Sequence, residues 1–233
     1  MSPTRNRRVE LNGAMFCYRE TGDGSRPTLV TLHALGEDAR DWDEVAQALS
    51  DRYKVLALDQ RGHGQSEHTN EYSFELMRDD LREFVDALGL DRFSLMGHSM
   101  GGLVALLFAE EWPERVERLV IEDAAPPAGD THRPEPPPEP PEPVSFDWRA
   151  VAPIRRQLND PDPAWWERLP EIAAPTLVVG GGSTSHIPLE DLEALSAGIP
   201  RCLLVAIEGA GHEVHSACRG RFLAAVEEFL VPQ

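Results

Sequence analysis

The chain has 233 residues, of which 40 are Asp or Glu and 22 are Lys or Arg, so that its formal net charge is −18. This excess of acidic groups argues against a nucleic-acid partner, because phosphate binding needs a basic surface. The length fits one domain with at most a small insertion, and a chain of this size can bury roughly 70% of its unfolded surface.

Hydropathy and cysteine content favour a soluble protein of a reducing compartment. With 41% hydrophobic residues the chain is typical of globular proteins, and no apolar run approaches the ~20 residues that span a bilayer. Residues 1–13 contain no apolar stretch after their arginines, so no secretory signal is predicted. Cys17, Cys202 and Cys218 are too widely spaced to indicate a disulfide framework or a zinc site. We therefore expect a cytoplasmic protein without a membrane partner or a bound metal.

Short β-branched runs alternate along the chain with patterns of helical periodicity. The turn signal Asn12-Gly13 predicts an opening hairpin. The later strand candidates are continuous apolar runs, as expected of a sheet that is covered by helices on both faces. The predicted strands span residues 7–11, 14–19, 28–33, 54–59, 93–98, 116–123, 175–180 and 201–207, and the predicted helices span residues 41–50, 74–88, 100–112, 188–198 and 219–230. This order predicts an α/β fold with a doubly wound, mostly parallel eight-stranded sheet, in a single domain of residues 1–233.

Residues from about 124 to 170 interrupt this alternation. Seven of the 20 prolines fall between Pro134 and Pro143, where no helix or sheet persists because proline lacks the N–H group and fixes φ. A short helix is predicted around residues 149–158, and Trp165 and Trp166 follow it. We interpret the segment as a short Pro-rich lid inserted after the sixth strand, with the two tryptophans as packing anchors or, alternatively, as ligand contacts.

The strongest local motif is Gly97-His98-Ser99-Met100-Gly101, a G-x-S-x-G pattern. It lies where an apolar strand ends and a helix rich in small residues begins, a turn that needs glycine on both sides of the serine. The serine hydroxyl is then exposed at the carboxyl edge of the sheet and at a helix N-terminus, whose dipole favours developing negative charge. Ser99 is therefore a candidate nucleophile, the alternative being a turn serine that caps its helix.

A serine hydroxyl is a poor nucleophile and needs a base. His212 follows Gly209-Ala210-Gly211 in a loop between the last predicted strand and the terminal helix, at the same edge of the sheet. Position therefore favours His212 as the base. His215 and His63 are interpreted as packing or hydrogen-bonding residues.

With these motifs, the chain resembles the α/β-hydrolase family over nearly its whole length. The matching segments occur in the family's order and spacing: LHALG (32–36), DQRGHGQS (59–66), GHSMGG (97–102) and EGAGHEVH (208–215). The resemblance implies that Ser99 is the nucleophile, that His212 is the general base and acid, and that the backbone N–H groups of Leu35 and Met100 form the oxyanion hole.

One departure from the family motif is mild. Ala34 replaces the glycine that usually follows the histidine of the first motif, but the oxyanion-hole donor there is a backbone group. We expect His33, Ala34, His98 and Trp166 to contact the substrate.

The acid of the triad departs from the family pattern more seriously. Most members carry an aspartate after the strand that corresponds to residues 175–180, and Thr184 occupies that position here. Some relatives carry the acid one strand earlier, where this chain has Glu122 and Asp123. Alignment on the strand favours Asp123, and Glu122 should point to the other face of the sheet. Glu122 is the second choice for the acid, and the alternative to both carboxylates is a dyad or a water-bridged arrangement.

The sequence therefore predicts a serine hydrolase that cleaves an ester, thioester or lactone of a small molecule through an acyl-enzyme. Serine at position 99 counts against epoxide hydrolase and dehalogenase chemistry, which use an aspartate nucleophile in this family. Two alternatives are a catalytically weakened protein that binds a small molecule and a biosynthetic acyl-transfer or cyclisation enzyme. No cofactor is implied, because Gly180-Gly181-Gly182 lacks dinucleotide-binding spacing. The oligomeric state is left open.

Overall fold

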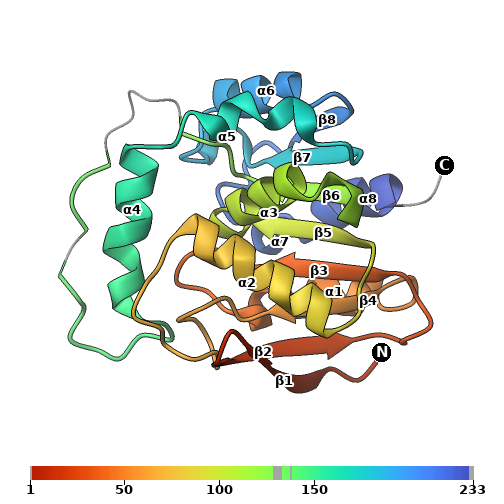
Figure 1. Cartoon of the computed structure of the whole chain (residues 1–233). Coiled ribbons are helices and arrows are strands. Elements are labelled where there is room, and N and C mark those ends of the chain that lie inside the picture. The colour runs from red at the N-terminus through yellow and green to blue at the C-terminus, as the bar shows by residue number, and fades with distance from the viewer. Residues whose placement is uncertain (1, 128–132, 137, 231–233) are drawn as a thin grey trace.

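The computed structural model describes residues 2–127, 133–136 and 138–230, and its centre is one eight-stranded sheet (Figure 1). The strands lie in the order β1-β2-β4-β3-β5-β6-β7-β8. Their bounds are Arg5–Leu11 (β1), Ala14–Thr21 (β2), Thr28–Leu32 (β3), Lys54–Leu58 (β4), Phe93–His98 (β5), Val116–Glu122 (β6), Thr176–Gly180 (β7) and Cys202–Ala206 (β8). The pairs β1/β2 and β2/β4 are antiparallel and all other pairs are parallel, which confirms the predicted fold class.

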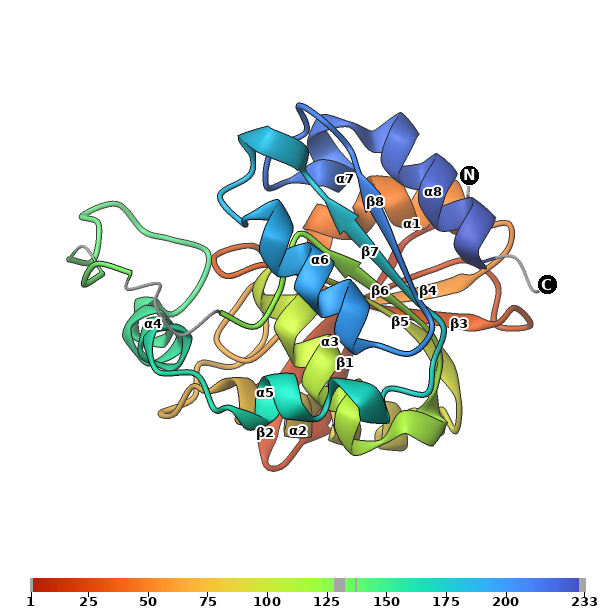
Figure 2. The same cartoon turned by 90° about the horizontal axis from the view of Figure 1, so that it is seen from above.

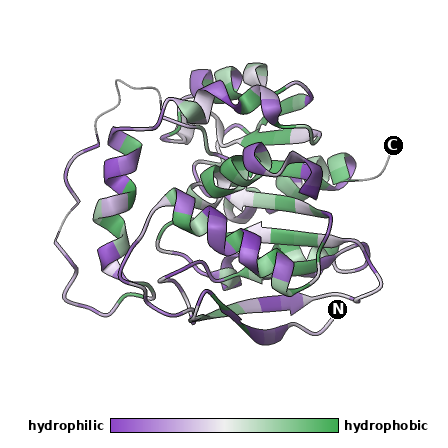
Figure 3. Cartoon of the chain, viewed as in Figure 1, coloured by the Kyte–Doolittle hydropathy of each residue, from purple (hydrophilic) through white to green (hydrophobic). Residues whose placement is uncertain are grey.

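Helices cover both faces of this sheet (Figure 2). The longer helices are α1 (Asp43–Leu49), α2 (Phe74–Ala87), α3 (Met100–Glu111), α4 (Val151–Asn159), α6 (Leu189–Gly198) and α8 (Arg219–Leu230), and the short ones are α5 (Ala164–Glu167) and α7 (Val214–Ala217). One hydrophobic core joins the sheet to α2, α3 and α6, and a second joins the other face to α1, α7 and α8. The continuous apolar runs of the central strands thus meet side chains on both faces, and these strands are mainly hydrophobic in Figure 3.

The predicted lid crosses the carboxyl end of the sheet between β6 and β7. Residues 128–132 and 137 of this segment lie outside the described residues. The helix α4 stands apart from the sheet (Figure 1) and is held to the start of α2 by Gln157, whose amide accepts from the Phe74 N–H at 2.9 Å and donates to Glu75 at 2.6 Å. Before α4, the Tyr72 hydroxyl donates to Asp147 at 2.5 Å. Hydrogen bonds thus hold the lid to the first turn of α2 and to the residues just before it.

No helix in the described part of the chain is long and apolar enough to cross a membrane.

Candidate active site

Ser99 occupies a strained turn between β5 and α3. Its backbone has φ +52° and ψ −114°, a conformation that non-glycine residues rarely adopt. A side chain at Gly97 would strike the carbonyl of Gly101, and one at Gly101 would strike the carbonyl of Leu32. The two glycines therefore allow the helix to approach β3 and β5 closely, and the turn projects Ser99 beyond the carboxyl edge of the sheet.

His212 lies beside Ser99, on the loop that follows β8. Its Nε2 atom is 2.8 Å from the Ser99 Oγ atom, and its Nδ1 atom is 2.7 Å from the Asp123 Oδ2 atom. The His98 imidazole donates from Nε2 to the backbone carbonyl of His212 at 2.9 Å, so the residue before the serine also holds the histidine loop. The three side chains predicted from the sequence are thus within hydrogen-bond distance in the order serine, histidine, aspartate.

Asp123 is fixed at the end of β6 by several groups. It has φ +45° and its side chain is fully buried. Its Oδ1 atom accepts from the backbone N–H of Gly181 at 2.8 Å, and its Oδ2 atom accepts from the Ser185 hydroxyl at 2.5 Å as well as from His212. A carboxylate that accepts three hydrogen bonds can be buried as an ion. Asp123 at the end of β6 is therefore the carboxylate that faces His212, whereas Thr184, at the position where most family members carry the acid, is exposed on the β7 loop.

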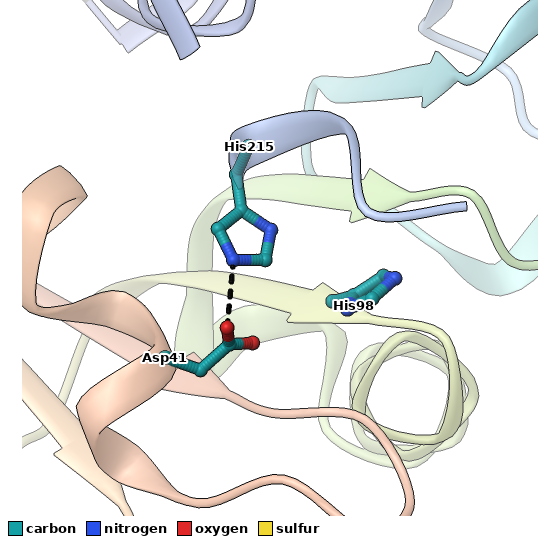
Figure 4. Close-up of side chains that lie close together, drawn as sticks. All are labelled: Asp41, His98 and His215. Carbon is teal, nitrogen blue, oxygen red and sulfur yellow. Dashed lines mark ion pairs between the residues drawn. The ribbon is translucent and has the colours of Figure 1, made fainter. Parts of the chain in front are cut away.

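Glu122 points to the opposite face, as the alternation of the strand predicts. Its carboxylate accepts from the backbone N–H of His215 at 2.7 Å, and both of its oxygens are 2.9 Å from the His215 Nδ1 atom. On the other side of the ring, His215 Nε2 is 3.1 Å from the Asp41 Oδ1 atom (Figure 4). Burial lowers the pKa of His215, but the neighbouring Asp41 and Glu122 carboxylates outweigh burial and raise that pKa to about 10. His215 is therefore a buried cation between two anions.

Asp41, His98 and His215 are the described residues whose spacing resembles that of a metal site (Figure 4). One ligand atom from each lies within 4.8 Å of the others. Because the raised pKa places a proton on His215 at neutral pH, a metal ion would have to displace that proton. The ion pairs of the protonated ring account for the cluster without a metal.

The charge on His215 predicts a pH-dependent stability. Its pKa in the folded protein, about 10, lies above the ordinary value of 6.5. The stabilisation of the folded protein by the charged ring is therefore complete below about pH 6.5 and is lost as the pH rises through 10. For this shift, the free energy of unfolding falls by on the order of 5 kcal/mol. In an NMR titration we expect the His215 ring to remain protonated at pH 8.

Urea unfolding supplies the second measurement of this prediction. The free energy of unfolding should fall less between pH 7 and pH 10 in Asp41→Asn than in wild type. His186→Gln is the control, because His186 is neutral throughout that range and its loss should leave the slope unchanged. A His215 ring that titrates near pH 6.5 would contradict the buried ion pair.

A cavity of about 100 Å³ opens beside Ser99. Leu35 and Met100 lie on its wall, as expected of the predicted oxyanion hole. Met100 is the first residue of α3, so that its N–H group has no acceptor within the helix, and the Leu35 N–H group donates to no acceptor among the described residues. Two backbone donors are thus available at the cavity that contains the Ser99 hydroxyl.

The four residues predicted to contact the substrate do not line this cavity. His33 is fully buried, where its Nδ1 donates to the Ala34 carbonyl and its Nε2 accepts from the Gln60 N–H. His98 is occupied by the His212 carbonyl, and the Trp166 indole donates to the Pro127 carbonyl at 3.3 Å. Ala34 is buried as well. None of the four is therefore on the wall of this cavity, because adjacency to a motif in the sequence does not place a side chain there, and their contact with substrate stays a prediction.

Two other polar residues on the wall were not predicted. His186 lies on the β7 loop with its ring 4.1 Å from that of His212, and Arg133 comes from the lid. The residue just before His186, Ser185, donates to Asp123, so the β7 loop contributes a partner of the acid although it carries no acid itself. Arg133 adjoins the Pro-rich segment, whose sequence has no helical or strand periodicity from which the position of a side chain could be predicted.

The fold and this arrangement of side chains define the class of protein. The family model of the alpha/beta hydrolase fold matches residues 27–149, and the chain belongs to this family of hydrolases.

Relatives and solved structures agree with this assignment. A Haemophilus influenzae protein with the provisional name esterase/lipase is 28% identical over 88% of this chain and 83% of its own length. The sn-1-specific diacylglycerol lipase ABHD11 of Mus musculus is 28% identical over 90% of this chain and 82% of its own. The crystal structure of a hydrolase from Pseudomonas aeruginosa PA01 is similar with a TM-score of 0.85 and 25% identity, over 98% of this chain and 99% of that one.

Proposed function

We propose that the protein is a serine hydrolase that cleaves a carboxylic ester, thioester or lactone of a small molecule through an acyl-enzyme. The observation that carries the proposal is the continuous chain of hydrogen bonds from Ser99 through His212 to Asp123. It lies beside a cavity with two backbone donors that have no acceptor among the described residues. A serine, a base and a buried orienting carboxylate in this geometry are the parts of a nucleophilic triad.

The proposed reaction has two halves. Ser99 Oγ attacks the substrate carbonyl carbon while His212 Nε2 takes the hydroxyl proton, and the N–H groups of Leu35 and Met100 stabilise the oxyanion. The carbonyl re-forms, the alcohol or thiol leaves with the proton from His212, and an acyl ester remains on Ser99. Water then attacks this ester with His212 again as the base, and His212 returns the proton to Ser99 Oγ as the acyl bond breaks and the acid is released. Asp123 holds the His212 Nδ1 proton throughout.

The size of the cavity bears on the substrate. A cavity of about 100 Å³ is smaller than the roughly 150 Å³ of an engineered cavity that binds benzene, so it suits a short acyl group. The esterase/lipase and lipase names of the two relatives support ester cleavage as the reaction.

Labelling with a fluorophosphonate tests the proposal directly. We expect one equivalent of probe to attach to Ser99, detected by intact mass and peptide mapping, and short-chain nitrophenyl esters to be hydrolysed. Folded protein that neither labels nor turns over esters would favour the alternative of a small-molecule binding protein. Burst release of the alcohol without release of the free acid, followed by turnover to an amide or a new ester only when an amine or alcohol acceptor is added, would favour acyl transfer.

A further inference from the structure

Arg133 is the one Lys or Arg residue among the described residues that line the cavity beside Ser99. It is half-buried, and apart from Ser99, Asp123 and His186 the rest of that wall is apolar. In a chain of net charge −18, the cavity therefore carries a cation where the protein as a whole is acidic.

The guanidinium of Arg133 has no carboxylate in ion-pair contact within the described part of the protein, and the charge of Asp191 acts on it only from a greater distance. Its NH1 group donates to the carbonyl of Leu158 at 3.2 Å, and it forms no ion pair with a described carboxylate. By contrast, Arg149 is paired with Asp147 and Arg168 with Glu111, each within 2.7 Å. Asp123, the one carboxylate on the same wall, already accepts hydrogen bonds from three other groups. Most of the five N–H donors of Arg133 are therefore available to a ligand.

The backbone of Arg133 is anchored at the end of α4. Asn159 accepts from the Arg133 N–H group at 2.7 Å and donates to the Arg133 carbonyl at 2.9 Å. Burial and the positive charge of the neighbouring Arg155 lower the pKa of Arg133, and the more weakly acting Asp191 carboxylate only partly opposes them. A half-buried cation beside a like charge is costly unless an anion joins it, and a guanidinium binds a carboxylate through two parallel hydrogen bonds.

We propose that Arg133 is a substrate-binding residue that selects small esters carrying a carboxylate near the scissile carbonyl. The inference rests on the proposed ester hydrolysis by Ser99, and it adds the chemical class of the substrate. The carboxylate sits at the lid side of the cavity, against Arg133, while the carbonyl lies between Ser99 and the two backbone donors.

Matched pairs of esters test this selection. Monomethyl succinate and methyl pentanoate differ at the end of the acyl chain, and acetoxyacetate and propyl acetate differ at the end of the leaving group. We expect wild type to prefer the charged member of one pair at least 10-fold in kcat/KM, measured by pH-stat, and the preferred pair tells which side of the ester carries the carboxylate. Arg133→Gln should lower kcat/KM for that ester by about 10- to 100-fold and for its neutral partner by less than about threefold. Arg133→Lys should restore part of the preference.

Arg156→Gln is the matched control, because Arg156 is exposed on α4, the helix that anchors the Arg133 backbone, and does not line the cavity. If Ser99 labels with the fluorophosphonate but Arg133→Gln lowers both members of a pair equally, or neither, the inference is wrong and the proposed function stands. If no ester is turned over, calorimetric titration with succinate still decides the point. Binding to wild type that is lost in Arg133→Gln supports the site, and absence of binding to wild type overturns it.

Discussion

Replacement of Ser99 by alanine is expected to lower kcat for ester hydrolysis by about 10⁶-fold and to abolish fluorophosphonate labelling. The substitution removes the Oγ atom that His212 contacts at 2.8 Å and that forms the acyl bond in the proposed reaction. Loss of the serine alone costs about this factor in a serine protease with the same triad chemistry. Because alanine must adopt the same positive φ, we expect little change in the thermal unfolding midpoint.

Ser94→Ala is the matched control for this prediction. Ser94 lies on the same strand, β5, and is buried, but it is remote from the cavity wall. We expect Ser94→Ala to keep kcat within about twofold. The measurement is initial rates with a nitrophenyl ester on purified variants whose circular dichroism matches that of wild type. A Ser99→Ala protein that keeps more than about 1% of wild-type kcat would show that another residue supplies the nucleophile.

The strands and the motif residues could be predicted because each has a local cause. The apolar runs fix the parallel strands, and the glycines around Ser99 can be recognised from the sequence because any side chain there would strike backbone atoms. The alternation of side chains along β6 also separates Asp123 from Glu122. In each case the information lies within a few residues of the position concerned.

Beyond the motif residues, the cavity wall could not be predicted, because it is built from contacts between distant segments. Arg133 reaches the wall through the lid and through Asn159 of α4, 26 residues further along the chain. The short helices α5 and α7, four residues each, are too brief to show a helical period. His33 and His98 adjoin the motifs in the sequence, but hydrogen bonds to the Gln60 N–H group and to the His212 carbonyl orient the two rings, and these contacts come from distant segments.

The second large effect on kcat is expected from replacement of Asp123, the proposed acid of the triad. Asp123→Asn is expected to lower kcat by about 10⁴-fold without unfolding the protein. The loss of kcat is expected because the three groups around the Asp123 carboxylate are all hydrogen-bond donors, and asparagine has only one oxygen to accept from them. Asparagine offers one oxygen and one NH₂ group. If the oxygen keeps the Gly181 N–H group, the NH₂ group faces His212 Nδ1, which must then be unprotonated. The His212 proton would move to Nε2, where it blocks removal of the Ser99 proton.

Glu122→Gln separates this effect from a general loss of negative charge at the end of β6. Its carboxylate contacts His215 rather than His212, so we expect kcat to stay within about 10-fold of wild type while the free energy of unfolding falls. Thr184 cannot replace the acid in Asp123→Asn, because it carries no charge and its hydroxyl is 3.5 Å from the Gly181 carbonyl. Steady-state kinetics and urea unfolding of the two variants decide the assignment. If Glu122→Gln lost turnover and Asp123→Asn kept it, the acid would lie on the other face of β6 and the orientation of His212 would need another source.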